Sequence, residues 1–147
     1  MNLIKQLDHL NMTVRDLAQT QEWYRRVFGF QTVEAGFQDG QPWAIIKAGE
    51  AMLCLYQRPD LRFVGRFERP LHGVNHLAFR ITDRDAWLGI VAREQLKLNY
   101  GDHTDYSHST SWYVEDPTGY EIEVALWEGD RVVFEPMDTE RSQPSGS

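Results

Sequence analysis

The chain has 147 residues, of which 41% are hydrophobic and 12% aromatic, and this composition is typical of one globular domain with its own core. A formal net charge of -7 without a Lys/Arg cluster excludes the basic face with which nucleic-acid-binding proteins neutralise phosphates. No stretch is apolar enough for a membrane span or a signal peptide, and the single cysteine excludes an internal disulfide. We therefore expect a cytoplasmic protein that binds neither nucleic acid nor membrane.

The first half of the chain reads as a strand, a helix and three further strands. In the run at 7–14, alternation places His9 on the face opposite Met12. Asp16 can cap the helix that follows, and Gly29 can end it. The predicted elements are a strand at 7–14, a helix at 16–29, and strands at 30–35, 42–48 and 51–57.

After a connecting segment at 58–71, the second half of the chain repeats this order. The run at 74–81 aligns with the first strand and has His76 at the position of His9. Near the C-terminal end, an Asp-Pro-Thr-Gly turn leads into a strand that places Glu123 on the face opposite its apolar neighbours. The predicted elements are a strand at 74–81, a helix at 83–96, a short strand at 97–100, a loop to His108, and two strands that flank 116–119.

The repeat predicts an α+β fold built from two copies of a βαβββ module. Module one spans about 5–57 and module two about 73–127, so that 1–127 form a single domain. Because each strand run has one apolar face for a helix and one face for a cavity, we expect the modules to pair into a cupped mixed β-sheet with the helices outside. The tail at 128–147 loses the periodicity, and its polar end at 141–147 is predicted to be disordered.

Two histidines and one carboxylate at corresponding places predict a divalent-metal site. A lone strand histidine is more often structural, but His9 and His76 occupy equivalent repeat positions and Glu123 lies on the matching face. Glu121 shares that face and is the residue most easily confused with the ligand. Cys54 aligns with Glu123 in the repeat, and we interpret it as a small buried hydrophobe because no basic residue adjacent in sequence would lower its pKa.

These stretches resemble the vicinal oxygen chelate superfamily, which includes glyoxalase I, extradiol ring-cleaving dioxygenases, fosfomycin-resistance enzymes and bleomycin-binding proteins. The resemblance covers about residues 5–127. It is carried by Asp8-His9-Leu10, Val14-Arg15-Asp16-Leu17, the helix end Phe28-Gly29-Phe30, Asn75-His76-Leu77-Ala78-Phe79, and Asp116-Pro117-Thr118-Gly119 followed by Glu123.

The resemblance implies that His9, His76 and Glu123 hold the metal, with an optional fourth ligand at Cys54. Glyoxalase I has a carboxylate at this fourth position, so the cysteine disfavours glyoxalase activity. Two histidines and one glutamate resemble the ligand set of non-haem Fe(II) oxygenases and the Mn(II) site of fosfomycin-resistance enzymes. We expect Fe(II) or Mn(II), with Zn(II) or Ni(II) as alternatives.

The resemblance to extradiol dioxygenases implies a catalytic role for Tyr113, which lies shortly before the turn at 116–119. It also implies an acid/base histidine several residues upstream, for which His103 and His108 are the candidates. Neither histidine has the family's spacing to Tyr113, and no histidine falls at 57–71, where a further acid/base histidine is expected.

The expected function is that of a metal-dependent, extradiol-type dioxygenase acting on a small molecule with two vicinal oxygens. The alternatives are a fosfomycin-resistance-like transferase or hydrolase, a glyoxalase-like lyase, and a metal-free small-molecule-binding protein similar to bleomycin-resistance proteins. The fosfomycin branch ranks second because Asn11 stands where its thiol-transferring members have threonine. The resemblance also implies a homodimer, in which the metal ligands either come from one chain or are shared between modules of different chains.

Overall fold

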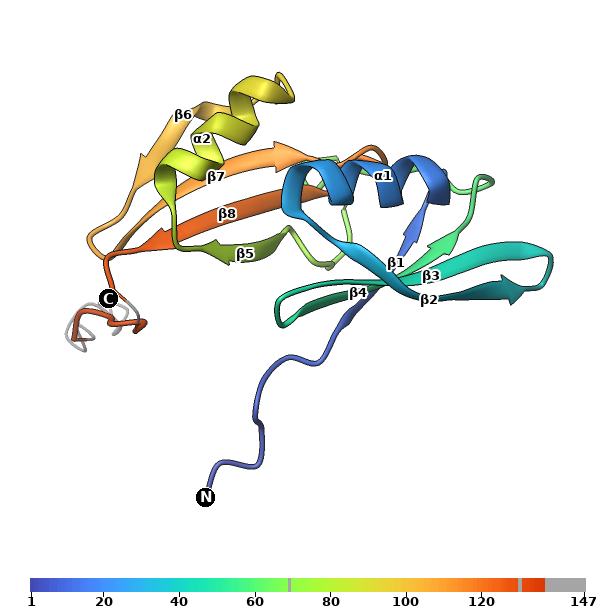
Figure 1. The fold of residues 1–147 in the computed structure, drawn as a ribbon, viewed down its shortest axis with the longest axis horizontal. Coiled ribbons are helices and arrows are strands. Elements are labelled where there is room, and N and C mark those ends of the chain that lie inside the picture. The colour runs from blue at the N-terminus through green and yellow to red at the C-terminus, as the bar shows by residue number, and fades with distance from the viewer. Residues whose placement is uncertain (69, 130, 137–147) are drawn as a thin grey trace, which may run out of the picture.

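Two four-stranded sheets with the same topology form the scaffold of the molecule (Figure 1). The computed structural model describes residues 1–68, 70–129 and 131–136. In each sheet the first strand of the module is parallel to the fourth strand, and the other pairs are antiparallel. This confirms the predicted α+β fold of two βαβββ modules. The expectation of disorder at 141–147 lies outside the described residues.

The elements follow the predicted order in both modules. The first module consists of β1 (Leu10–Val14), α1 (Leu17–Phe28), β2 (Gln31–Gln38), β3 (Gln41–Ala48) and β4 (Ala51–Gln57), with the sheet order β1-β4-β3-β2. The second module consists of β5 (Leu77–Ile81), α2 (Arg84–Arg93), β6 (Asn99–Asp105), β7 (Ser109–Glu115) and β8 (Glu121–Trp127), with the sheet order β5-β8-β7-β6.

An aspartate caps the N-terminus of each helix. Asp16 accepts a hydrogen bond from the backbone N–H of Gln19 at 2.8 Å, and Asp83 accepts one from Ala86 at 2.9 Å. At the other end of α1, Gly29 adopts a left-handed φ of 74°, a conformation that costs glycine little. The N-cap and stop predicted for the first helix are therefore confirmed.

Both helices lie on one side of the two sheets (Figure 1), and the apolar strand faces are buried beneath them. Leu53 of β4 and both Ile122 and Val124 of β8 belong to this core. We call the opposite face of each sheet its open face. Glu121 and Glu123 alternate with the buried residues of β8 and so lie on the open face, as the strand parity predicts.

Helix α1 joins the two modules. The ring of Phe28 stacks on Trp87 of α2, with 5.7 Å between centroids, and meets Phe79 of β5 edge-on at 5.1 Å. Tyr24 donates a buried hydrogen bond of 2.9 Å to Asp116, in the turn before β8. The helix of the first module therefore also contacts the second module, at β5, at α2 and at the turn before β8.

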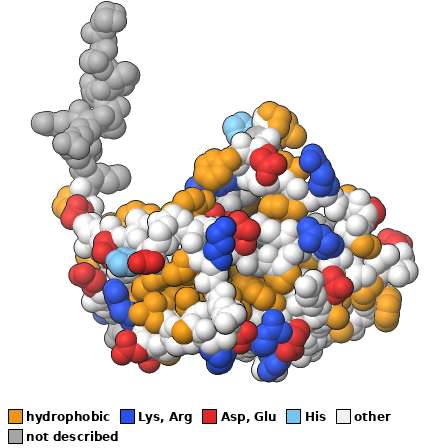
Figure 2. Space-filling model, turned by 90° about the horizontal axis from the view of Figure 1, so that it is seen from above, with side chains coloured by type: hydrophobic (Ala, Val, Ile, Leu, Met, Phe, Trp, Pro, Cys, Tyr) orange, Lys and Arg blue, Asp and Glu red, His pale blue; other side chains and the backbone are white. Residues whose placement is uncertain are grey.

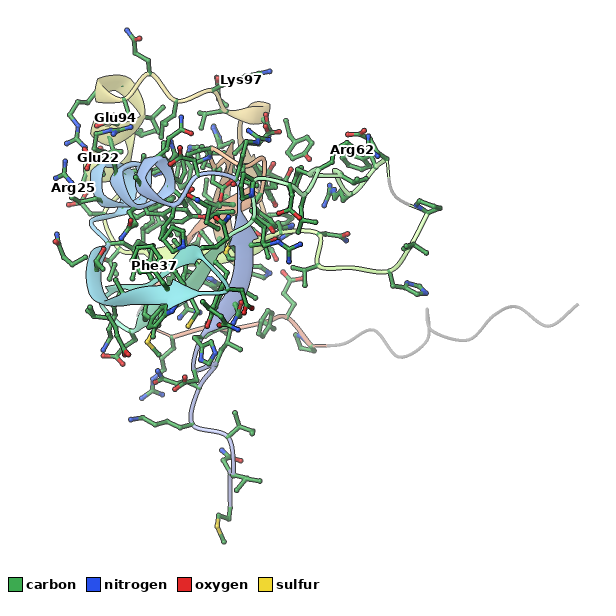
Figure 3. All side chains as sticks on the ribbon, turned by 90° about the vertical axis from the view of Figure 1, so that its right-hand side faces the viewer. Glu22, Arg25, Phe37, Arg62, Glu94 and Lys97 are labelled. Carbon is green, nitrogen blue, oxygen red and sulfur yellow. The ribbon has the colours of Figure 1, made fainter. Side chains whose placement is uncertain are left out.

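The helical side of the molecule carries mixed charge. Glu22 and Arg25 of α1 lie at the same edge as Glu94, the residue after α2 (Figure 3), and Arg26 reaches Glu94 across a 3.3 Å ion pair. Figure 2 shows acidic and basic side chains interspersed over this side, with hydrophobic ones between them. None of the helices in the described residues is long and apolar enough to cross a membrane.

Strand boundaries differ from the predicted ones where apolar alternation is weak. β1 and β5 begin at Leu10 and Leu77, so each candidate histidine directly precedes its strand. β6 continues to Asp105, where the sequence predicts a loop. The pairing of β6 with β7 shifts register between Asn99 and Thr104, and the polar residues of this irregular edge strand give no periodic signal.

The two sheets remain separate in hydrogen bonding. Within the described residues no strand pairing joins them, so β1 and β5 are edge strands. A cavity of about 380 Å³ lies between these edges and is lined by Asn11 and Thr13 from β1 and by His76 before β5. The sequence predicts one cupped sheet, whereas the chain forms two separate four-stranded sheets.

Candidate metal site

The second module brings His76 and Glu123 together on its open face. Their atoms Nε2 and Oε2 lie 2.9 Å apart. Glu123 is held from the other side by Ser111 of β7, which donates a hydrogen bond of 2.6 Å to Oε1. Both carboxylate oxygens of Glu123 therefore have a defined direction, with one of them facing the imidazole.

Tyr113 lies directly opposite Glu123 in the β7–β8 register, and its ring stands edge-on to that of His76 at 5.8 Å. Its hydroxyl lies 3.1 Å from that of Tyr106. Burial, the hydrogen bond with Tyr106 and the negative charge of Glu123 all raise the pKa of Tyr113. The phenol thus stays protonated near neutral pH and can donate a hydrogen bond.

Glu121 lies on the other side of His76, and only 12% of its side chain is exposed. Tyr100 donates a hydrogen bond of 2.5 Å to its Oε2. Its Oε1 lies 3.7 Å from Nδ1 of His76 and 3.9 Å from Nη1 of Arg66. Among the described residues, Oε1 of Glu121, Nδ1 of His76 and Nε of Arg66 are buried without a hydrogen-bond partner.

The turn before β8 holds both glutamates in place. Asp116 Oδ1 accepts hydrogen bonds of 2.9–3.0 Å from the backbone N–H groups of residues 118, 119 and 120. Gly119 has a φ of 117°, and a Cβ there would stand 2.9 Å from the ring of Phe63. The turn therefore requires glycine, and its network fixes where β8 starts.

His9 lies at the other sheet, just before β1. Its Nδ1 forms a 2.7 Å hydrogen bond with Oδ2 of Asp8, and 43% of its side chain is exposed. Because a carboxylate only accepts hydrogen bonds, the proton of this contact belongs to Nδ1, which leaves the Nε2 lone pair of a neutral His9 available to a metal.

Cys54 occupies the open face of β4, where its register partner is Asn11. Burial and the nearby charges of Asp8 and Glu34 raise the pKa of its thiol. On the same face, the rings of Trp43 and Tyr56 stack at 6.2 Å. Cys54 is therefore a protonated, partly buried thiol beside aromatic side chains, without the thiolate character of a nucleophile.

The single chain does not gather the whole predicted ligand set. His76 and Glu123 meet, but His9 is not with them, and the described residues contain no group of three or more His, Cys, Asp or Glu side chains that could hold a metal ion. The donor set itself fits a divalent metal, because His76 offers Nε2 beside a carboxylate while its other nitrogen, an orphaned buried atom, faces a second carboxylate.

In the part of the chain that the structure describes, neither candidate acid/base histidine contacts His76 or Glu123, although His108 stacks at 6.1 Å on Tyr106, the hydrogen-bond partner of Tyr113. His103 contacts Asp105 at 3.3 Å and its ring lies 6.4 Å from Trp112, which faces the helices. His108 binds the Ser109 hydroxyl at 2.8 Å and stacks on Trp127 at 4.4 Å. Trp127 is four residues beyond Glu123 on β8, roughly 13 Å along the strand.

Several residues of the site carried no sequence signal. Arg66 comes from the connecting segment and Tyr100 from the irregular start of β6, so their approach to Glu121 depends on tertiary packing. Ser111 could have been found, since it alternates with Tyr113 on β7 and must share its face.

Comparison with known proteins assigns the chain to a family. A model of the "Glyoxalase/Bleomycin resistance protein/Dioxygenase superfamily" matches residues 6–124. Catechol-2,3-dioxygenase of Bacillus subtilis (strain 168) is 26% identical over 132 residues, which cover 85% of this chain and 45% of that protein. The chain thus spans about half the length of this curated relative.

Solved structures share the fold. The glyoxylase/bleomycin resistance protein/dioxygenase domain from Frankia sp. EAN1pec has a TM-score of 0.72 at 18% identity and covers 87% of this chain and 96% of its own. The genomically encoded fosfomycin resistance protein from Listeria monocytogenes has a TM-score of 0.67 at 16% identity, with coverages of 83% and 93%. The duplicated βαβββ scaffold and the family match lead to one conclusion: the chain belongs to the glyoxalase/bleomycin resistance/dioxygenase superfamily.

Proposed function

We propose that this protein is a metal-dependent enzyme of the dioxygenase type, which acts on a small substrate with two vicinal oxygens. The approach of His76 Nε2 to Glu123 Oε2 at 2.9 Å, beside Tyr113 on one open face, is the observation that carries the proposal. The similarity to a catechol dioxygenase supports the proposed type of reaction. The proposed ligands are His9, His76 and Glu123.

The residues around the site have separable tasks. Fe(II) or Mn(II) would act as a Lewis acid toward the substrate oxygens and, in the case of iron, would activate O₂. Ser111 keeps the Glu123 carboxylate oriented. Tyr113, a phenol that is protonated at neutral pH, donates a hydrogen bond to a substrate oxygen, and Tyr106 orients that hydroxyl. His103 has no role in the proposal, because its contacts are with Asp105 and Trp112. His108 is connected to the site through Tyr106, on which its ring stacks, and has no direct role in the proposal.

We further propose a homodimer in which the metal is shared between chains. His9 is apart from His76 and Glu123 within one chain, and β1 and β5 offer unpaired edges within the described chain. The residues before β1 extend away from the body (Figure 1) and expose Leu3, Ile4 and Leu7. A partner that covers these side chains would bring its own His9 to the second-module site.

Two measurements test the activity. Protein purified without chelators is analysed for bound metal, and O₂ consumption is followed with catechols after loading with Fe(II) or Mn(II). We expect one metal per site and O₂ uptake that Tyr113→Phe strongly reduces. Metal without O₂ uptake would contradict the dioxygenase reaction. Absence of bound metal after loading with Fe(II), Mn(II), Zn(II) or Ni(II) would contradict the whole proposal and favour a metal-free binding protein.

Mixing two inactive variants tests the shared site. His9→Ala and Glu123→Ala each lack one ligand in every site of their own homodimer. After subunit exchange, a mixed dimer regains one intact ligand set, and metal binding returns for that site. Recovery of no metal, or a monomer by light scattering, would contradict the shared arrangement.

A further inference from the structure

Three buried polar atoms meet around Glu121 without forming a hydrogen bond. They are Oε1 of Glu121, Nδ1 of His76 and Nε of Arg66. Oε1 lies 3.7 Å from Nδ1 of His76 and 3.9 Å from Nη1 of Arg66. Buried polar groups are nearly always paired, so a cluster of unpaired ones requires a reason. Here one of the three atoms belongs to a proposed metal ligand.

Glu121 is oriented toward His76 by its surroundings. Tyr100 holds Oε2 through a hydrogen bond of 2.5 Å, and the guanidinium of Arg66 lies 5.8 Å from the centre of the Tyr100 ring. With Oε2 occupied in this way, Oε1 is the oxygen left to face the imidazole. A movement of less than about 1 Å would bring it to hydrogen-bond distance of Nδ1.

A histidine that binds a metal through Nε2 keeps its proton on Nδ1. That proton needs an acceptor, and a carboxylate there fixes the ring and strengthens the ligand. Glu123 lies at Nε2 of His76 and Glu121 lies at Nδ1. The two glutamates are two residues apart on one strand face and thus lie next to different nitrogens of the same ring.

In the first module a carboxylate also lies at Nδ1 of the histidine, but it comes from a different chain position and forms a hydrogen bond. Nδ1 of His9 is bonded to Asp8 at 2.7 Å. By the repeat alignment, Asn75 stands at the position of Asp8, and Met52 at the position of Glu121. Each module therefore supplies one carboxylate to Nδ1 of its histidine, although the positions that supply it are not equivalent.

Building on the proposed function, we propose that Glu121 is the positioning residue of His76. Glu121 does not bind the metal. It accepts the Nδ1 proton of His76, and Tyr100 and Arg66 hold it in the orientation for that contact.

The test compares Glu121→Gln with Glu115→Gln. Glu115 is the register partner of Glu121 on β7, is exposed, and loses the same charge. Zn(II) affinity is measured by competition with a chromogenic chelator. We expect Glu121→Gln to weaken binding by about 10- to 100-fold with unchanged stoichiometry at saturation, and Glu115→Gln to stay within about twofold of the wild type. Tyr100→Phe, which frees Glu121 without touching His76, should show a smaller loss.

A second readout distinguishes positioning from a structural role. In the Zn(II)-loaded protein, the Nδ1 proton of His76 should give a downfield NMR signal because its acceptor is a carboxylate. Glu121→Gln should move this signal upfield, and Glu115→Gln should leave it in place. If both variants bind Zn(II) like the wild type, or if the signal does not move, the inference is overturned. If Glu121→Gln binds none at saturation, Glu121 is itself a ligand. If the wild type binds no metal, the proposed function fails instead.

Discussion

The two modules share a topology but differ in what their open faces contain. In the first module, this face holds the exposed His9 together with a protonated Cys54 and the stacked pair Trp43–Tyr56. In the second module, six consecutive residues of β7 are buried, and a polar network surrounds His76 and Glu123. The two modules therefore share a scaffold, but the network of polar side chains lies in the second module.

The largest difference between the modules is expected when the open-face residue at equivalent positions of β8 and β4 is replaced by alanine. Glu123→Ala should weaken metal binding by more than about 100-fold, which exceeds the effect of losing an outer carboxylate, because a ligand is removed. Cys54→Ala, at the equivalent position of β4, should leave metal affinity within about threefold. Titration with Mn(II) by calorimetry measures both. A large loss for Cys54→Ala would show that the first module contributes a second ligand.

The turns before the last strands should differ in their effect on stability. Asp116 is buried and accepts hydrogen bonds from Tyr24 and from three backbone N–H groups. We expect Asp116→Ala to lower the free energy of unfolding by about 2–4 kcal/mol. Glu50→Ala, in the exposed turn before β4, should change it by less than about 0.5 kcal/mol. Urea denaturation at pH 7 compares the two, and similar values would contradict the assigned role of the Asp116 network.

The smallest effect concerns the pH dependence of the second module. The pKa of Tyr113 is raised in the folded protein, so its contribution to stability is full below the unfolded value of about 10 and is lost as the pH rises through the folded-state pKa. From about pH 10 upward, the wild type should lose more stability with rising pH than Tyr113→Phe. Chemical denaturation at several pH values measures this difference. Parallel curves would mean that Tyr113 ionises as an ordinary phenol.

Local chemistry made the scaffold predictable. Asp16 and Gly29 mark the two ends of α1 through contacts within a few residues. Strand alternation places Glu123 and Ile122 on different faces of β8, wherever β8 lies in the fold. The surroundings of Glu121 were not predictable, because Arg66 and Tyr100 reach it from segments without periodicity. The separation of His9 from His76 is also a tertiary property, which the repeat alignment of two histidines does not contain.

The packing of α1 has a consequence for how the chain unfolds. Phe28 packs on Trp87 of the second module, and Tyr24 forms a hydrogen bond with Asp116 in the turn before β8. Neither module can therefore unfold without exposing apolar surface that the other covers. We expect the two modules to unfold on heating in a single transition. A fragment that ends at residue 57 should aggregate through its exposed apolar surface instead of folding independently. The repeat unit of the sequence is therefore smaller than the unit of folding.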